Sequence, residues 1–158
     1  MDSYKIQAFL HIAVALVAIG VTFVYPFLQG WAEQRGVGAT RLALQFGEHL
    51  EKIVVLPGAL LVFLFGLGLI FDDKTSYKDD FPLWLGVAIA WYVLVVAISL
   101  GIQRPTVARA IAALDGVPDD GDFPPAYMEA SRKMQVVGGF MGFSAIAITF
   151  LMVWKPWQ

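Results

Sequence analysis

Two histidines are the side chains in this sequence best suited to hold a cofactor. His11 lies near the start of a charge-free stretch, where an imidazole is costly unless it finds a partner. One interpretation makes His11 an axial ligand of haem or a related tetrapyrrole, with Met152 as a candidate second ligand at similar depth. In the alternative interpretation, His11 bonds to a neighbouring helix and Met152 only fills packing space.

The second histidine, His49, belongs to a polar cluster with Glu48 and Lys52. The spacing of Glu48 and Lys52, i and i+4, allows an ion pair on a helix. The cluster is either an entry site for protons or ions, or the solvated face of a helix leaving a membrane, and the second interpretation is favoured. On antiparallel helices His11 and His49 are expected about 25 Å apart, which excludes one haem ligated by both.

Several kinds of chemistry are excluded by residues that the sequence lacks. Without cysteine there are no disulfides, thiolate nucleophiles, iron–sulfur clusters or cysteine zinc sites. The sequence contains no nucleophile–base pair, phosphate-binding loop or zinc signature. We therefore predict no catalytic residue and no metal site. A net charge of −2 gives no reason to expect a nucleic-acid partner.

Four charge-free stretches must position these residues, at 6–32, 53–71, 81–103 and 134–154. The chain is 58% hydrophobic and 15% charged, whereas soluble domains have about 45–50% apolar and about 25% charged residues. Each stretch reaches or approaches the roughly 20 residues that cross a bilayer. Backbone groups in lipid must bond within their own segment, so each stretch should be helical. We predict an all-α membrane protein, an antiparallel bundle of four transmembrane helices.

The expected organisation is one transmembrane domain over residues 1–158, with spans at about 5–29, 45–71, 82–103 and 133–154. The second helix is predicted to begin near Thr40, as its cap, and to project beyond the bilayer. The third is predicted to continue past Arg104 as an amphipathic helix, and Pro26 and Pro57 are candidate kinks. Loops 30–39 and 115–130 would share one end, here called the loop end. Loop 72–80 and both termini would share the other, the terminal end.

Basic residues are more numerous at the loop end, seven against four at the terminal end. The positive-inside rule then places the loop end in the cytoplasm and both termini outside, in a bacterial cytoplasmic (inner) membrane. The expected partners are the lipid bilayer and other membrane subunits that pack on glycine faces. Gly138, Gly139 and Gly142 form such a helix-packing face by their spacing.

Several segments resemble an uncharacterised family of predicted four-span bacterial membrane proteins. They are residues 8–12 (AFLHI), 25–28 (YPFL), 56–59 (LPGA), 65–69 (FGLGL) and the Arg104-Pro105 pair. More distantly, His11 and the glycine-ended second span resemble the haem-binding, four-span protoporphyrinogen oxidase family. That family also carries a lysine in its third helix, and residues 81–103 contain none. This second resemblance implies a shared scaffold only.

Taken together, these features favour a membrane protein without a catalytic site. We expect an accessory or structural subunit of a larger membrane complex. The alternative is a b-type haem or other tetrapyrrole-binding redox protein that uses His11.

Overall fold

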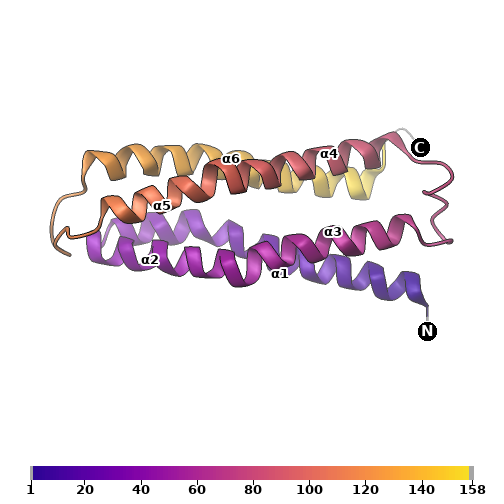
Figure 1. The fold of residues 1–158 in the computed structure, drawn as a ribbon, viewed down its shortest axis with the longest axis horizontal. Coiled ribbons are helices and arrows are strands. Elements are labelled where there is room, and N and C mark those ends of the chain that lie inside the picture. Colours follow the sequence, from indigo (N-terminus) through magenta and orange to yellow (C-terminus); the bar gives the residue numbers. More distant parts are fainter. Residues whose placement is uncertain (1, 157–158) are drawn as a thin grey trace.

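The computed structural model describes residues 2–156, which form four long helical rods joined by short loops (Figure 1). The first rod is α1 (Ser3–Glu33) and the fourth is α6 (Pro125–Trp154). The second consists of α2 (Val37–Leu50), the π-helical turn η1 (Glu51–Val55) and α3 (Leu56–Ile70). The third consists of α4 (Leu83–Ile98), the π-helical turn η2 (Ser99–Gln103) and α5 (Arg104–Ala113). All four are long and apolar enough to cross a membrane, which confirms the predicted fold class.

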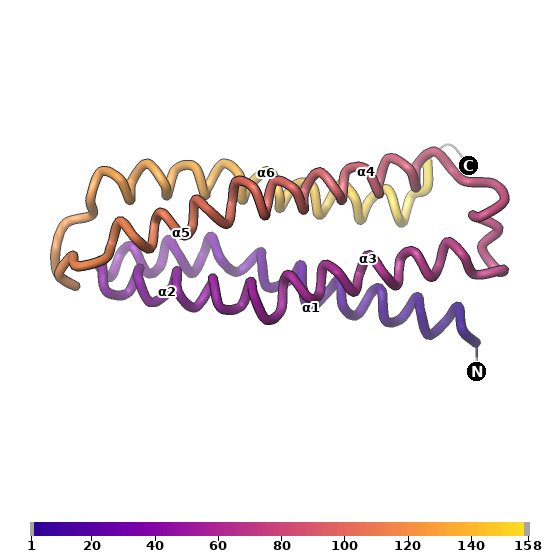
Figure 2. Tube along the Cα trace, viewed as in Figure 1, coloured from indigo at the N-terminus to yellow at the C-terminus, as the bar shows by residue number. Residues whose placement is uncertain are grey.

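The rods run antiparallel in two hairpins, α1 with α2 and α3, and α4 and α5 with α6 (Figure 2). The two hairpins lie together at the loop end and diverge toward the terminal end (Figure 1). Between the charge-free stretches, Tyr92 on α4 connects the two hairpins. Its hydroxyl donates to the Ala59 carbonyl at 2.7 Å, and its ring stacks on Phe63.

Both π-helical turns lie just before a proline, Pro57 or Pro105. A proline has no N–H to donate, and its ring clashes with the carbonyl four residues earlier. Widening one turn removes that clash, and Leu56 and Arg104 donate instead to the carbonyls of Glu51 and Ser99. Pro57 distorts its helix as expected, whereas α1 continues as an α-helix through Pro26.

Two helix boundaries differ from the sequence prediction. The second rod begins at Val37, preceded by Gly36 with a φ of 98°. Thr40 is therefore not the cap, which corrects that prediction, and its hydroxyl donates to the Gly36 carbonyl from inside the helix. The fourth rod begins at Pro125, so residues 125–130 are helical where a loop was expected. Both helices therefore begin well before their charge-free stretches, at 53–71 and 134–154.

The larger buried core lies at the loop end, largely outside the charge-free stretches. We call this part of the bundle, residues 25–52 and 104–133, the headpiece. Helices in lipid leave apolar side chains on their outer surface, but helices in water must bury apolar side chains against each other. The headpiece is thus a small four-helix bundle built on the ends of the membrane spans. Its core consists of Val37, Leu44, Ala110, Leu114, Tyr127 and Ala130, with Met134 at its membrane edge.

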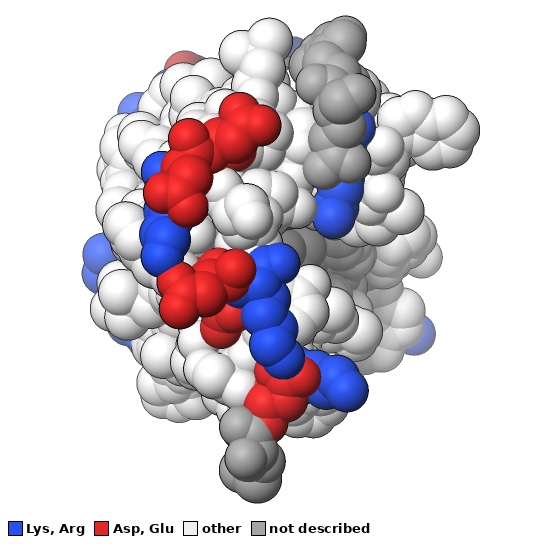
Figure 3. Space-filling view, turned by 90° about the vertical axis from the view of Figure 1, so that its right-hand side faces the viewer, with Lys and Arg blue, Asp and Glu red and all other residues white. Residues whose placement is uncertain are grey.

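The terminal end carries charged side chains of both signs, close to one another (Figure 3). Asp2 pairs with Lys74 at 2.6 Å, and the hydrogen bond from Lys74 lowers the pKa of the Asp2 carboxyl. Lys78 pairs with Asp73 in the same loop, which lowers the pKa of Asp73. The Asp2–Lys74 pair attaches the loop between α3 and α4 to the start of α1, and the Lys78–Asp73 pair lies within that loop.

Candidate functional site

His11 faces α3 and bonds to its backbone. The ring Nδ1 lies 2.9 Å from the Val62 carbonyl oxygen. In a neutral imidazole this bond requires the proton on Nδ1, which leaves Nε2 as a free acceptor. A Cβ built on Gly66 would lie 3.2 Å from His11 Cε1, so the ring packs over a glycine.

Met152, the other candidate haem ligand, lies in a separate packing environment. It contacts the buried cluster of Ile70, Trp84 and Leu85 near the terminal end. The neighbours of His11 are instead Val62 and Gly66 on α3. Within residues 2–156, no group of three histidine, aspartate or glutamate side chains could hold a metal ion.

Glu48, His49 and Lys52 lie around the end of α2, next to η1. Glu48 and Lys52 form the i, i+4 ion pair at 2.9 Å, and His49 is exposed. Glu51, in the next turn, is half-buried, and the nearest charged groups that act on it are Arg104, Glu48 and Lys52. The cluster lies where the helix crosses from the charge-free stretch into the headpiece.

The glycines of α6 and α3 differ in how closely other helices approach them. A Cβ on Gly142 would lie 3.6 Å from the Phe23 ring, and one on Gly138 would lie 3.8 Å from Gln103. A Cβ on Gly139 would meet nothing within 4 Å. Gly58 on α3 is tighter, because a Cβ there would overlap the Ala18 methyl of α1. The closest packing therefore joins α1 and α3.

A polar network joins α1 to α6 inside the headpiece. Oε1 of Glu33 accepts hydrogen bonds from the Tyr127 hydroxyl at 2.5 Å, from Gln29 Nε2 at 3.0 Å and from the Ser131 hydroxyl at 3.1 Å. Tyr127 and Ser131 are buried. A carboxylate with three donors is well satisfied without a cation, so the network stabilises the contact between these two helices.

Arg41 of α2 holds the end of α5 and the loop that follows it. Its guanidinium donates to the Leu114 carbonyl at 3.0 and 3.2 Å and to the Val117 carbonyl at 2.5 Å. It also pairs with Asp119 at 3.1 Å. The last carbonyls of a helix lack internal donors, and the arginine supplies them. Arg41 thereby ties the two hairpins together at the loop end.

One outward surface of the headpiece is apolar, and we call it the headpiece apolar face. It lies on the neighbouring helices α1 and α2, where large apolar side chains remain exposed. Arg35 stacks on Trp31 with its guanidinium carbon 3.7 Å from the ring centre. The exposed fractions are 79% for Phe27, 53% for Trp31, 68% for Leu42 and 52% for Phe46.

This face extends farther than the charge-free stretch on the second rod. That stretch ends at Ile53, beside the Glu48–Lys52 pair, whereas Phe46 and Leu42 lie about 10 and about 16 Å farther along the helix. Tyr25 donates to the Gly47 carbonyl at 3.0 Å, which fixes the register of α1 against α2. Trp31 therefore lies beside the first turns of α2. The α5–α6 side of the headpiece is instead lined by charged side chains, including Arg109, Glu129, Arg132 and Lys133.

The sequence prediction did not assign any role to Glu33, Tyr127 or Arg41. A signal is nevertheless present in the spacing. Gln29 and Glu33 are four residues apart at the end of α1, and Tyr127 and Ser131 are four apart at the start of α6. Two polar pairs at matching helix ends indicate a polar contact once the topology places these ends together.

Comparisons with known proteins place the chain in one family. Residues 5–156 match the model of DUF2269, described as a predicted integral membrane protein. No curated protein and no solved structure matches the chain. The resemblance to the haem-binding oxidase family gains no support from these comparisons. The match covers nearly the whole chain and agrees with the four apolar helices, so the chain belongs to the DUF2269 family of predicted integral membrane proteins.

Proposed function

We propose that this protein is a non-catalytic accessory subunit of a larger membrane complex and that it binds another membrane protein through its headpiece apolar face. The observation that carries the proposal is the exposure of Phe27, Trp31, Leu42 and Phe46 beyond the level of Ile53. Contiguous apolar surface of this kind marks an interaction site.

Depth favours a protein over lipid as the partner of this face. The headgroup layer adds only about 5–7 Å on each side of a hydrocarbon core of about 30 Å. Leu42 lies about 16 Å beyond Ile53, which is farther than that layer reaches. An apolar helix surface of another subunit would cover the whole face.

Rigidity of the headpiece supports a binding role. The Glu33 network and the Arg41 bonds fix α1 and α2 against α5 and α6. A preformed face loses little conformational entropy on binding, so more of the free energy of its apolar contacts contributes to affinity. We place the headpiece in the cytoplasm of a bacterial cell, because it carries seven basic residues against four at the terminal end.

Substitution within the face tests the proposal. We expect the double variant Phe27→Ser/Phe46→Ser to lose a subunit that co-purifies from native membranes with the wild type. Phe27→Leu/Phe46→Leu, which keeps the surface apolar, should retain it. A photo-reactive residue at position 46 should crosslink to the same subunit, and one at Arg109 on the opposite side should not. A lone monomer, or a crosslink only to a second copy of this chain, would contradict the accessory role.

A second candidate function, binding of b-type haem by His11, is favoured by one observation. The bond from Nδ1 to the Val62 carbonyl leaves Nε2 available, and this is the nitrogen through which such a histidine binds iron. Haem would supply redox chemistry, and His11 would hold and orient it. Two surface grooves of the described chain, one along α6 at the loop end and one between α1 and α6, are lined without His11. Haem binding is therefore the second candidate.

An absorption spectrum separates the two functions. If His11 binds haem, protein expressed with adequate haem should show a Soret band that His11→Ala abolishes and His49→Ala retains. Protein without a Soret band under these conditions would exclude this second function.

A further inference from the structure

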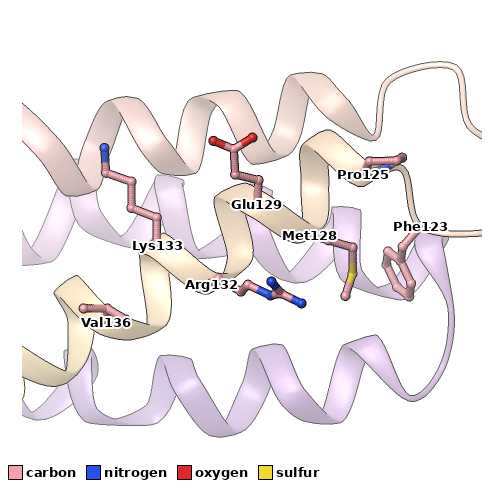
Figure 4. A pocket seen from close by; sticks show the side chains of 7 residues that line it. All are labelled: Phe123, Pro125, Met128, Glu129, Arg132, Lys133 and Val136. Carbon is pink, nitrogen blue, oxygen red and sulfur yellow. The ribbon is translucent and has the colours of Figure 1, made fainter.

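A groove of about 740 Å³ lies on the outward side of α6 at the loop end. This volume falls within the range of about 300–1,000 Å³ typical of ligand pockets. Phe123 of the preceding loop closes the outer end of the groove, and Val136 lies at its other end, nearest the membrane (Figure 4). The remaining lining residues are Pro125, Met128, Glu129, Arg132 and Lys133.

The groove follows one face of α6 that no other helix covers. Its α6 residues, at positions 125, 128, 129, 132, 133 and 136, recur once in each helical turn, as residues along one broad side of a helix do. Met128 is 45% exposed and Val136 is 74% exposed. Arg132 extends along the groove toward Met128, while Lys133 and Glu129 extend to the other side of the helix (Figure 4).

Arg132 and Lys133 form no ion pair with the described part of the chain. Glu129 has the right spacing to pair with either, yet neither lies within 4 Å of it. Lys52 of the second rod, by contrast, is held by Glu48 at 2.9 Å. Two cations and one carboxylate leave the groove with a net charge of +1.

The order of side chains along the groove matches the layers of a membrane surface. Val136 lies inside the charge-free stretch 134–154, next to the lipid-facing Phe140. Arg132 and Lys133 directly precede that stretch, so they lie at the depth of the lipid phosphates. A ligand that fits is an amphiphile with an apolar chain and an anionic head.

We propose that this groove binds an anionic phospholipid of the loop-end leaflet. The phosphate lies against the Arg132 guanidinium, Lys133 adds its positive charge from the other side of α6, and an acyl chain descends along Val136 and Phe140. Long basic side chains at this depth keep their charge in the headgroup layer while their stems cover apolar surface. Glu129 limits the attraction, since a carboxylate one turn away repels the phosphate. This proposal is independent of the headpiece apolar face, which lies on α1 and α2.

Lipid binding to the purified full chain tests the proposal. We would measure binding of phosphatidylglycerol and phosphatidylcholine by native mass spectrometry in detergent. The wild type should prefer phosphatidylglycerol. The double variant Arg132→Gln/Lys133→Gln should bind phosphatidylglycerol roughly 30-fold more weakly, since each basic residue near an anionic surface contributes about one kcal/mol. Glu129→Gln should strengthen binding a few-fold. Lys52→Gln, which removes a cation at the same depth but outside the groove, should change binding less than twofold.

Three outcomes would overturn the proposal. The first is equal binding of the two lipids by the wild type, and the second is a loss in Lys52→Gln as large as in the double variant. The third is displacement of phosphatidylglycerol by soluble glycerol phosphate, because the ligand would then be a free phosphate compound. If the double variant proves unstable, Glu129→Gln tests the proposal instead, since it should bind phosphatidylglycerol more strongly than the wild type. Weaker binding by Glu129→Gln would refute the role of the groove.

Discussion

Replacing Glu33 by alanine is expected to lower the free energy of unfolding of the headpiece by about 3 kcal/mol. Hydrogen bonds to a charged group contribute about 1.5–3 kcal/mol each, and buried donors are costly to leave unpaired. The carboxylate accepts from Tyr127, Gln29 and Ser131. Tyr127 is only 1% exposed, so its hydroxyl has little access to water as a replacement acceptor.

Thermal unfolding in detergent measures this effect. A loss of about 3 kcal/mol corresponds to a fall in Tm of about 6–12 °C for a chain of this size. Glu33→Gln keeps one acceptor oxygen and should lose less than Glu33→Ala. Glu129→Ala is the matched control, since it removes an exposed carboxylate from the same headpiece without breaking a hydrogen bond. Equal melting temperatures for Glu33→Ala and Glu129→Ala would show that the network does not hold α1 to α6.

The loss should be local to the headpiece. Amide hydrogen exchange should accelerate in α2, α5 and the first turns of α6, whereas the membrane portions of α3 and α4 stay protected. The reason is that the Tyr92 contacts with Ala59 and Phe63 bridge the hairpins independently of Glu33. Uniform acceleration along all four rods would instead indicate one cooperative unit.

The positions of the four helices were predictable because bilayer thickness sets the length of an apolar stretch. The same rule could not place the ends of the helices. Residues 125–130 were expected to be a loop, because they lie outside the charge-free stretch 134–154. In the structure this segment is helical because Tyr127 and Ala130 fill the headpiece core, which is a tertiary effect.

The candidate site was harder to predict than the fold. No partner was predicted for Glu33 or Arg41, since the groups that they bind in the structure lie 94 and 73 residues away in the sequence. The spacing of glycines predicted a packing face at Gly138, Gly139 and Gly142, yet it is a Cβ on Gly58 that would overlap a methyl group of another helix, that of Ala18. Spacing shows that small residues share a face, but only the packed structure shows which helix approaches it.

The two proposed surfaces of the headpiece are chemically distinct and lie on different helices. The α1–α2 side carries exposed apolar side chains beyond the charge-free stretch of the second rod, whereas the α6 side carries two cations without an ion pair in the described part of the chain. A protein partner on the first side and an anionic lipid on the second would both fix the rotation of the bundle about the membrane normal. The Glu33 network connects the two sides, so its loss should weaken the function of both.

The contact between Gly58 of α3 and Ala18 of α1 gives the second large effect, within the membrane portion. Both residues are buried, and a Cβ on Gly58 would occupy the space of the Ala18 methyl. Glycine to alanine usually stabilises a helix by about 1 kcal/mol. Here the sign should reverse, because overpacking costs about 1–3 kcal/mol, and Gly58→Leu should prevent the hairpin from closing.

A compensating substitution makes this prediction specific. Ala18→Gly combined with Gly58→Ala moves the single methyl group from α1 to α3, so the double variant should recover most of the Tm that Gly58→Ala loses. Gly139→Ala is the matched control, since a Cβ there meets nothing within 4 Å, and it should melt no lower than the wild type. If Gly58→Ala also melts like the wild type, or if Ala18→Gly fails to rescue it, α1 and α3 do not pack through this contact. Rescue would establish that close approach of these two helices, set by one methyl group, determines the stability of the first hairpin.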